Sequence, residues 1–249
     1  SRSFKPEEIP FTIRSWDGRV PAYHVLASRI GIRQIGLWGR FNKENPEKVS
    51  LPGVETIEKQ GNTWLSGIEL SRIERQGWDG YTEESLKQGI TTFLKTYAHR
   101  GLAHIVLGNE PNENPAKVAE KIRAYKLGYE TVKAFDPNIN VIATSVPAIR
   151  EWWEQGFHKY CDAFDFHVYE TYAGVRNGVK KYKALMEEFG IDKPIYCTEL
   201  GLNSQGQTRY AVAREVVKKI TAFFAEGGVS VSWFGIQYPD PDGKSRGSS

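Results

Sequence analysis

Residues 102–112 read Leu-Ala-His-Ile-Val-Leu-Gly-Asn-Glu-Pro-Asn, and this stretch carries both a fold signal and a chemical signal. The apolar run at its start is typical of a buried strand, and the Gly, Asn and Pro residues that follow end the strand abruptly. Glu110 stands at that end. Desolvation raises the pKa of a carboxyl group, as a general acid working near neutral pH requires. We therefore expect Glu110 to be a general acid and expect a second carboxylate at the end of a later strand.

The second carboxylate is found in residues 193–201, which read Lys-Pro-Ile-Tyr-Cys-Thr-Glu-Leu-Gly. The run before Glu199 predicts another buried strand, and Glu199 stands at its end. Strand alternation predicts that Cys197 and Glu199 lie on one face, which points inward.

Strand-like and helix-like segments alternate along the whole chain. The clearest helix start is Thr82, which can act as the N-cap and is followed by two acidic residues in the first turn. Besides the opening stretch, the predicted strands are residues 11–16, 32–38, 63–70, 139–146, 163–169, 194–198 and 229–238. The predicted helices are residues 21–29, 54–60, 82–101, 115–134, 149–159, 175–189 and 208–225.

This alternation favours a parallel sheet, and eight such units in 249 residues match the size of a closed barrel. We predict one α/β domain, a single (β/α)₈ TIM barrel over residues 1–240. The polar residues 241–249 are expected to be a loose or artificially added tail. The alternative is an open doubly wound sheet, which would need a glycine-rich phosphate loop. Neither G-x-G-x-x-G nor G-x-x-x-x-G-K-[ST] occurs in the chain.

Composition argues against several classes of partner. The 33 basic and 30 acidic residues are interspersed, so we expect neither nucleic acid nor an anionic membrane as a partner. The five histidines lack the paired spacing of a metal site, and we expect no metal and no cofactor. Cys161 and Cys197 are not expected to form a disulfide. The start Ser-Arg-Ser suggests a processed chain, and we expect an extracellular or periplasmic monomer.

The active site of such a barrel forms at the carboxyl ends of the strands, and polar side chains gather there in this sequence. The fourth and seventh strands, which carry Glu110 and Glu199, lie roughly across the barrel from each other. Asp165, His167 and Tyr169 share one face of the sixth strand. His104 lies deeper on the fourth strand and is expected at the barrel floor.

Gly-Asn-Glu-Pro-Asn at the fourth strand, together with Pro-Ile-Tyr-Cys-Thr-Glu-Leu-Gly at the seventh, resembles the retaining glycoside hydrolases built on (β/α)₈ barrels. The layout is most similar to the xylosidase/iduronidase-like branch and its endo-acting bacterial relatives. The resemblance implies that Glu110 is the acid/base and Glu199 the nucleophile. It also implies that Asn109 hydrogen-bonds the sugar 2-hydroxyl. The implied activity is hydrolysis of a β-linked oligo- or polysaccharide by double displacement, with endo cleavage slightly favoured.

The resemblance also implies substrate-binding roles for further residues. His167 and Tyr169 would orient the nucleophile or touch the sugar, and Trp233 would form a platform under it. Trp38 and Trp78 can stack on sugar faces as well, with core packing as the alternative.

One position departs from the pattern of the resemblance. These hydrolases usually end the second strand with an arginine that supports the nucleophile, and here Gly36 stands at that place. Arg14 or Arg40 is expected to substitute for it. The departure leaves open a catalytically inactive carbohydrate-binding barrel. A weaker alternative is a barrel enzyme that acts on a phosphorylated metabolite, but residues 202–208 and 237–243 offer few phosphate-binding features.

Overall fold

The computed structural model describes residues 11–14, 21–42, 44–68, 81–111, 117–143, 148–204 and 206–234. Within these residues, eight parallel strands form one sheet in the order β6-β5-β4-β2-β1-β9-β8-β7. They are β1 (Phe11–Arg14), β2 (Gln34–Phe41), β4 (Thr63–Ile68), β5 (Leu102–Leu107), β6 (Asn140–Ala143), β7 (Phe164–Val168), β8 (Ile195–Leu200) and β9 (Ser230–Phe234). The short strand β3 (Val49–Ser50) pairs antiparallel with the end of β2.

The two ends of this sheet, β6 and β7, are joined by backbone hydrogen bonds. The amide of Asp162 donates to the carbonyl of Val141 over 2.7 Å, and the amide of Ala143 donates to the carbonyl of Ala163 over 2.9 Å. The sheet is therefore a barrel, which confirms the predicted (β/α)₈ fold and excludes the open doubly wound alternative.

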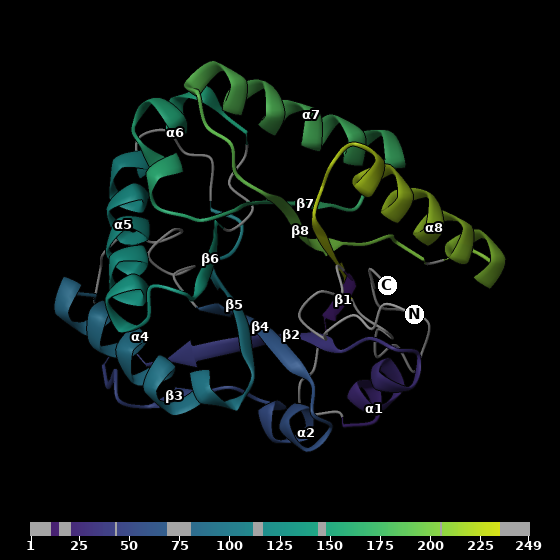
Figure 1. The fold of residues 1–249 in the computed structure, drawn as a ribbon. Helices are drawn as coiled ribbons and strands as arrows, with labels where there is room; N and C mark the ends of the chain where they lie inside the picture. The colour runs from purple at the N-terminus through teal and green to yellow at the C-terminus, as the bar shows by residue number, and fades with distance from the viewer. Residues whose placement is uncertain are drawn as a thin grey trace.

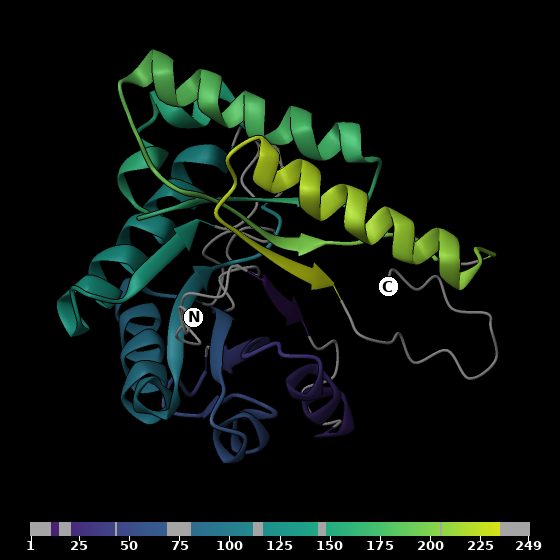
Figure 2. The same ribbon diagram turned by 45° about the vertical axis from the view of Figure 1, so that its right-hand side comes forward.

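Helices surround the strands, as Figure 1 shows. They are α1 (Pro21–Arg29), α2 (Val54–Lys59), α4 (Glu83–Tyr97), α5 (Val118–Phe135), α6 (Arg150–Glu154), α7 (Tyr172–Phe189) and α8 (Arg209–Ala225), with 3₁₀ turns η2 (Ala98–Arg100) and η4 (Phe157–Lys159). The predicted cap at Thr82 is confirmed: its hydroxyl accepts from the Ser85 amide over 3.0 Å, and its amide donates to the Ser85 hydroxyl over 2.9 Å. Helices α7 and α8 lie side by side against the last strands (Figures 1 and 2). No helix among the described residues has the length and apolar character to cross a membrane.

Two apolar layers hold the barrel together. The larger one lies between the strands and the helices and includes Trp64, Phe93 and Tyr182. The inner layer fills the barrel and consists of Leu65, Val106 and Ile142 from the strands and Ala163 directly before β7, with Tyr196 packed on them. Each large apolar side chain buried in this way contributes roughly 1.5–3 kcal/mol to stability.

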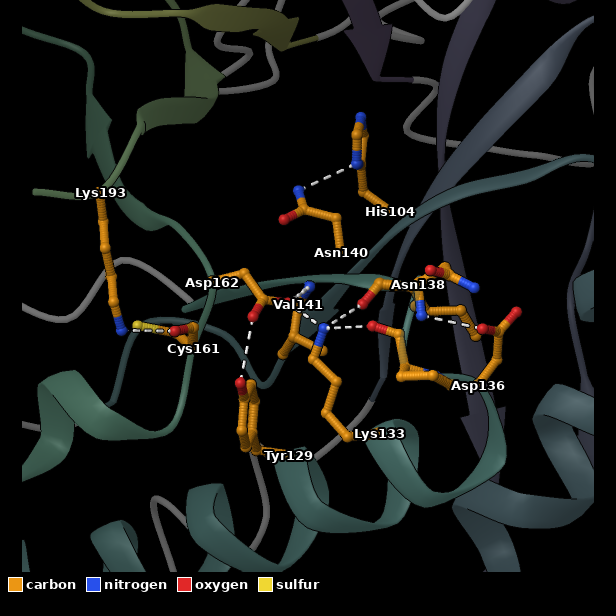
Figure 3. A network of polar contacts seen from close by, with 12 residues as sticks. His104, Tyr129, Lys133, Asp136, Asn138, Asn140, Val141, Cys161, Asp162 and Lys193 are labelled. Carbon is orange, nitrogen blue, oxygen red and sulfur yellow. Dashed lines mark hydrogen bonds and ion pairs between the residues drawn. The ribbon is translucent and has the colours of Figure 1, made fainter.

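A polar network joins β6 to β7 near their amino ends, and Figure 3 shows its members. The Asp162 carboxylate accepts from the Val141 amide over 2.8 Å and from the Tyr129 hydroxyl over 3.1 Å, and it pairs with the Lys133 ammonium at 2.5 Å. Lys133 also donates to the Ile139 carbonyl over 2.7 Å. Because Asp162, two residues before β7, bonds both to β6 and to α5, this network holds β6 and β7 together, where the pairing of the sheet is limited to a single bridge.

His104 lies at the barrel floor, as predicted. Its Nδ1 is 3.1 Å from the Asn140 amide nitrogen (Figure 3), and its ring meets that of Tyr196 edge to face. Burial lowers the pKa of His104 to about 4, so this histidine is neutral at physiological pH.

Candidate active site

The turn after β5 delivers Glu110 to the mouth of the barrel. The amide of Gly108 still donates to the Ile68 carbonyl over 2.9 Å, and the chain then turns with positive φ at Gly108 (78°) and at Glu110 (42°). A residue with a side chain costs on the order of 1–2 kcal/mol in the left-handed region. Among the described residues Glu110 is the one non-glycine residue in that conformation, and backbone strain of this kind is concentrated at functional sites.

His167, at the carboxyl end of β7, brings the two predicted catalytic carboxylates together. Its Nδ1 is 2.8 Å from an oxygen of Glu110 and 3.4 Å from an oxygen of Glu199. The other ring nitrogen, Nε2, is 3.2 Å from the Thr198 hydroxyl and 3.5 Å from an Asp165 carboxylate oxygen. The imidazole is therefore enclosed by three acidic side chains, and its own side chain is only 6% exposed.

This setting raises the pKa of His167 to about 9. Burial is the largest single effect and would lower the pKa, because it disfavours the charged ring. The charge of Glu199, the hydrogen bonds that the ring donates to Asp165 and Glu110, and the charge of Asp165 together outweigh it. His167 is consequently an imidazolium at neutral pH.

The two glutamates differ in their surroundings. The Glu110 side chain is 49% exposed, whereas that of Glu199 is 9% exposed, so Glu110 does not have the desolvated setting that its place after an apolar strand led us to expect. Glu199 also accepts a hydrogen bond of 2.8 Å from the Tyr169 hydroxyl. One oxygen from each glutamate and one His167 nitrogen all lie within 4.8 Å of one another. A reacting group between the glutamates would thus meet a solvent-accessible carboxyl on one side and a buried, fixed one on the other.

A β-bulge sets the direction of Glu199. The β7–β8 pairing shifts register between Asp165 and His167, which stand opposite Tyr196 and Glu199. The extra residue is Thr198, whose amide and hydroxyl both donate to the Asp165 carboxylate, over 2.7 and 2.8 Å. A bulge of this kind re-aims the side chain next to it.

The bulge corrects one prediction, that Cys197 and Glu199 lie on the same face. Cys197 is completely buried in the layer between strands and helices, whereas Glu199 contacts His167 and Tyr169. Strict alternation fails here because two residues of β8, Cys197 and Thr198, stand opposite the single residue Phe166 of β7. Both Cys161 and Cys197 are free thiols, as predicted.

The predicted sugar-binding aromatics fall in three different places. Trp38 is half-buried inside the barrel, where its ring packs on Gly67 of the neighbouring strand: a Cβ added there would lie 2.4 Å from the ring. Trp233 is 6% exposed and belongs to the layer between strands and helices, with Val231. Trp78 lies outside the described residues. A sugar-binding role for each of them stays a prediction.

The remaining sequence predictions concern Asn109 and the arginine. Asn109 is half-buried in the same turn as Glu110, directly before it. Gly36 is buried in β2, as expected from its place in the strand, and Arg40 is exposed near the end of that strand. The Arg14 side chain lies outside the described residues. Which arginine supports Glu199 therefore stays open between the two.

Several residues of the site were missed from the sequence or left without a role. The sequence predicts that Asp165 shares the face of His167 but assigns it no function, although a charged residue between Phe164 and Phe166 in a strand is a signal for one. Thr198, Phe234 and Lys219 gave no such signal. The ring of Phe234 contacts Tyr169 with centroids 5.7 Å apart, and Lys219 donates to the Tyr169 carbonyl over 3.1 Å.

Glu110, His167 and Glu199 are also the described residues whose donor atoms are close enough to hold a metal ion. A histidine must be neutral to act as a ligand, and the raised pKa of His167 means that an ion would have to displace a proton at neutral pH. The absence of a metal stays a prediction.

Comparison with known proteins shows the fold. No protein-family model and no curated protein matches the chain. Among solved structures, it is similar to a family 39 glycoside hydrolase from Bacteroides cellulosilyticus WH2, with a TM-score of 0.74 and 19% identity over 98% of this chain and 61% of the other.

The chain is also similar to the GH53 catalytic domain of Ignisphaera aggregans, with a TM-score of 0.61 and 15% identity over 98% of this chain and 90% of the other. A third similar structure is the hyperthermostable endo-1,4-β-D-mannanase of Thermotoga petrophila RKU-1, with a TM-score of 0.60 and 15% identity over 93% and 87% of the two chains. This chain spans 61% of the length of the family 39 enzyme, so it corresponds to part of that protein.

Proposed function

We propose that the chain is a glycosidase that cleaves a β-linked oligo- or polysaccharide with retention of configuration. The observation that supports this most is the convergence of Glu110 and Glu199 on one nitrogen of His167, with carboxylate oxygens within 4.8 Å. Retaining glycosidases hold their two carboxyl groups ≈ 5–5.5 Å apart, and inverting ones ≈ 6.5–9.5 Å apart. The glycoside hydrolases among the similar structures add support at the level of the fold.

The surroundings of the two glutamates suit different roles. Glu199 is buried and fixed by the Tyr169 hydroxyl, which suits a nucleophile held in place to attack the anomeric carbon. Glu110 is half-exposed and can exchange its proton with water, which suits a group that first protonates the leaving oxygen and then activates water. The charged His167 lies between them and can donate to whichever carboxylate is ionised.

The proposal extends to the setting of the enzyme. The chain would act as a monomer outside the cytoplasm, with neither nucleic acid nor a membrane as partner. Asn109, Trp38 and Trp78 would contact the sugar, and endo cleavage is slightly favoured over exo cleavage.

Two glutamate variants and a panel of aryl glycosides test the proposal. Glu199→Ala should abolish turnover, and added azide should restore it with an inverted glycosyl azide as product, because azide occupies the space of the nucleophile. Glu110→Ala should keep activity only on substrates with good leaving groups, and azide should then give a retained product. Glu187→Ala changes an exposed glutamate of α7 and is the matched control. Full activity of Glu199→Ala would refute the mechanism.

A second candidate is a catalytically inactive carbohydrate-binding barrel, which Gly36 favours because it stands where an arginine usually supports the nucleophile. It predicts saturable binding of oligosaccharides by calorimetry without release of reducing ends. The same panel distinguishes the two candidates.

A further inference from the structure

Lys219 is a buried ammonium in the middle of α8 that the proposed chemistry does not use. Its exposure is 0%, and with Phe223 it makes up the buried face of that helix. Burial lowers the pKa of Lys219, while the nearby carboxylates of Glu215 and Glu170 act in the opposite direction. A charge in such a place is costly unless hydrogen bonds satisfy it, so its partners are informative.

Those partners are two backbone carbonyls next to the candidate active site. The Lys219 ammonium donates to the carbonyl of Gly201 over 2.6 Å and to that of Tyr169 over 3.1 Å. Tyr169 directly follows the last residue of β7, and Gly201 directly follows the last residue of β8. The two extensions are themselves paired, since the Gly201 amide donates to the Val168 carbonyl over 3.1 Å. One side chain of α8 therefore ties together the points where β7 and β8 open into the mouth of the barrel.

Gly201 also helps to determine where the Tyr169 ring lies. The ring packs directly on Gly201, where an added Cβ would come within 2.5 Å of Cε1 of the tyrosine. Phe234 meets the ring edge to face. The hydroxyl at the far end of this ring donates to Glu199 over 2.8 Å. A shift of either carbonyl would move the ring and, with it, the hydrogen bond on the carboxylate.

We propose that Lys219 is a positioning residue for Glu199: by binding the carbonyls of Tyr169 and Gly201, it holds the Tyr169 hydroxyl against the Glu199 carboxylate. This inference rests on the proposed function for its catalytic consequence, whereas its structural part concerns Lys219 and Tyr169 alone. Lys219 touches neither the reacting atoms nor the predicted substrate, and it acts through the tyrosine.

The first experiment is a double-mutant cycle with Lys219→Met and Tyr169→Phe. Lys219→Met removes the ammonium and keeps the length of the side chain, and displacement of a catalytic group by about 1 Å can cost on the order of 100-fold in rate. We expect kcat to fall by about 10- to 100-fold with KM changed less than about threefold. We also expect Lys219→Met to cause no further loss in a Tyr169→Phe background, because the hydroxyl through which it acts is gone. Independent, multiplicative losses would overturn the inference.

The control is Lys218→Met, which removes the neighbouring lysine of the same helix. Lys218 is exposed, pairs with Glu215 at 3.2 Å and lies over the ring of Tyr172, so its loss should leave kcat unchanged. An equal fall in kcat in Lys218→Met would show that any charge lost from α8 has this effect, and it would overturn the inference.

The second experiment does not depend on activity. ¹⁹F NMR of protein labelled with fluorotyrosine, with the Tyr169 signal assigned from Tyr169→Phe, should show that signal shifted or broadened in Lys219→Met and unchanged in Lys218→Met. If Lys219→Met does not fold, Lys219→Gln, which keeps one donor group, takes its place. An unmoved Tyr169 signal in the folded variant would overturn the inference. Wild-type protein that cleaves no glycoside would instead refute the proposed function, and the NMR result would still decide the role of Lys219.

Discussion

The pKa of His167 makes a quantitative prediction about the pH dependence of folding. A free histidine has a pKa of 6.5, and in the folded protein the pKa of His167 is about 9. The folded state therefore binds the proton more tightly than the unfolded state does. The resulting stabilisation is fully present below pH 6.5 and is lost as the pH rises through about 9. At about 1.4 kcal/mol for each unit of pKa, this difference corresponds to roughly 3–4 kcal/mol in the free energy of unfolding.

Urea unfolding between pH 6 and pH 10 measures this contribution. His167→Gln keeps a hydrogen-bonding group but cannot be protonated, so the wild-type stability should fall relative to that of the variant by about 3 kcal/mol across this range. For a domain of this size that fall corresponds to roughly 6–12 °C in melting temperature. The difference between the two proteins is the decisive quantity, because other titrating groups contribute to both.

Two stability curves that stay parallel from pH 6 to pH 10 would contradict the raised pKa of His167. Parallel curves would mean that His167 has the same pKa in the folded and unfolded states, so the three acidic neighbours would not hold a proton on it. A direct check is the ¹⁵N chemical shift of the His167 ring, which should report a protonated imidazole at pH 7.5.

Two further predictions concern the barrel itself. Asp162→Ala removes the acceptor of the Val141 amide in β6 and the partner of Lys133 and Tyr129 in α5. It should cost about 2–3 kcal/mol in urea unfolding, and an unchanged unfolding midpoint would count against the network. Gly67→Ala places a methyl group 2.4 Å from the Trp38 ring. The substitution should quench or shift the fluorescence of Trp38 and weaken oligosaccharide binding measured by calorimetry. Unchanged binding would show that Trp38 does not contact the substrate.

The local features of this protein could be predicted from the sequence because their causes lie within a few residues. The Thr82 cap depends on an exchange of hydrogen bonds with Ser85, three residues away. The strands follow from apolar runs, and their alternation with helices predicts the barrel. The end of β5 before Gly108 and the position of Glu110 in the turn that follows the strand also follow from the local sequence.

The orientation of Glu199 could not be predicted in the same way. Period-two alternation placed it on the face of Cys197, and this was wrong because Thr198 forms a bulge held by the carboxylate of Asp165, 33 residues earlier. The local sequence of β8 does not reveal the bulge, because the residue that stabilises it lies in another strand. Lys219 was missed for a similar reason, because its two acceptors are 50 and 18 residues away.

The sequence by itself thus determined the barrel, the two candidate carboxylates and the strands that carry them, since these depend on hydrophobic pattern and turn chemistry. Only the tertiary structure decided how the carboxylates meet: on one nitrogen of His167, at different exposures, with Tyr169 fixing one of them. The physical reason is that the charge state of a group depends on everything within a few ångströms. The neighbours of His167 come from two strands, β7 and β8, and from the turn after β5, and folding of the barrel brings them together.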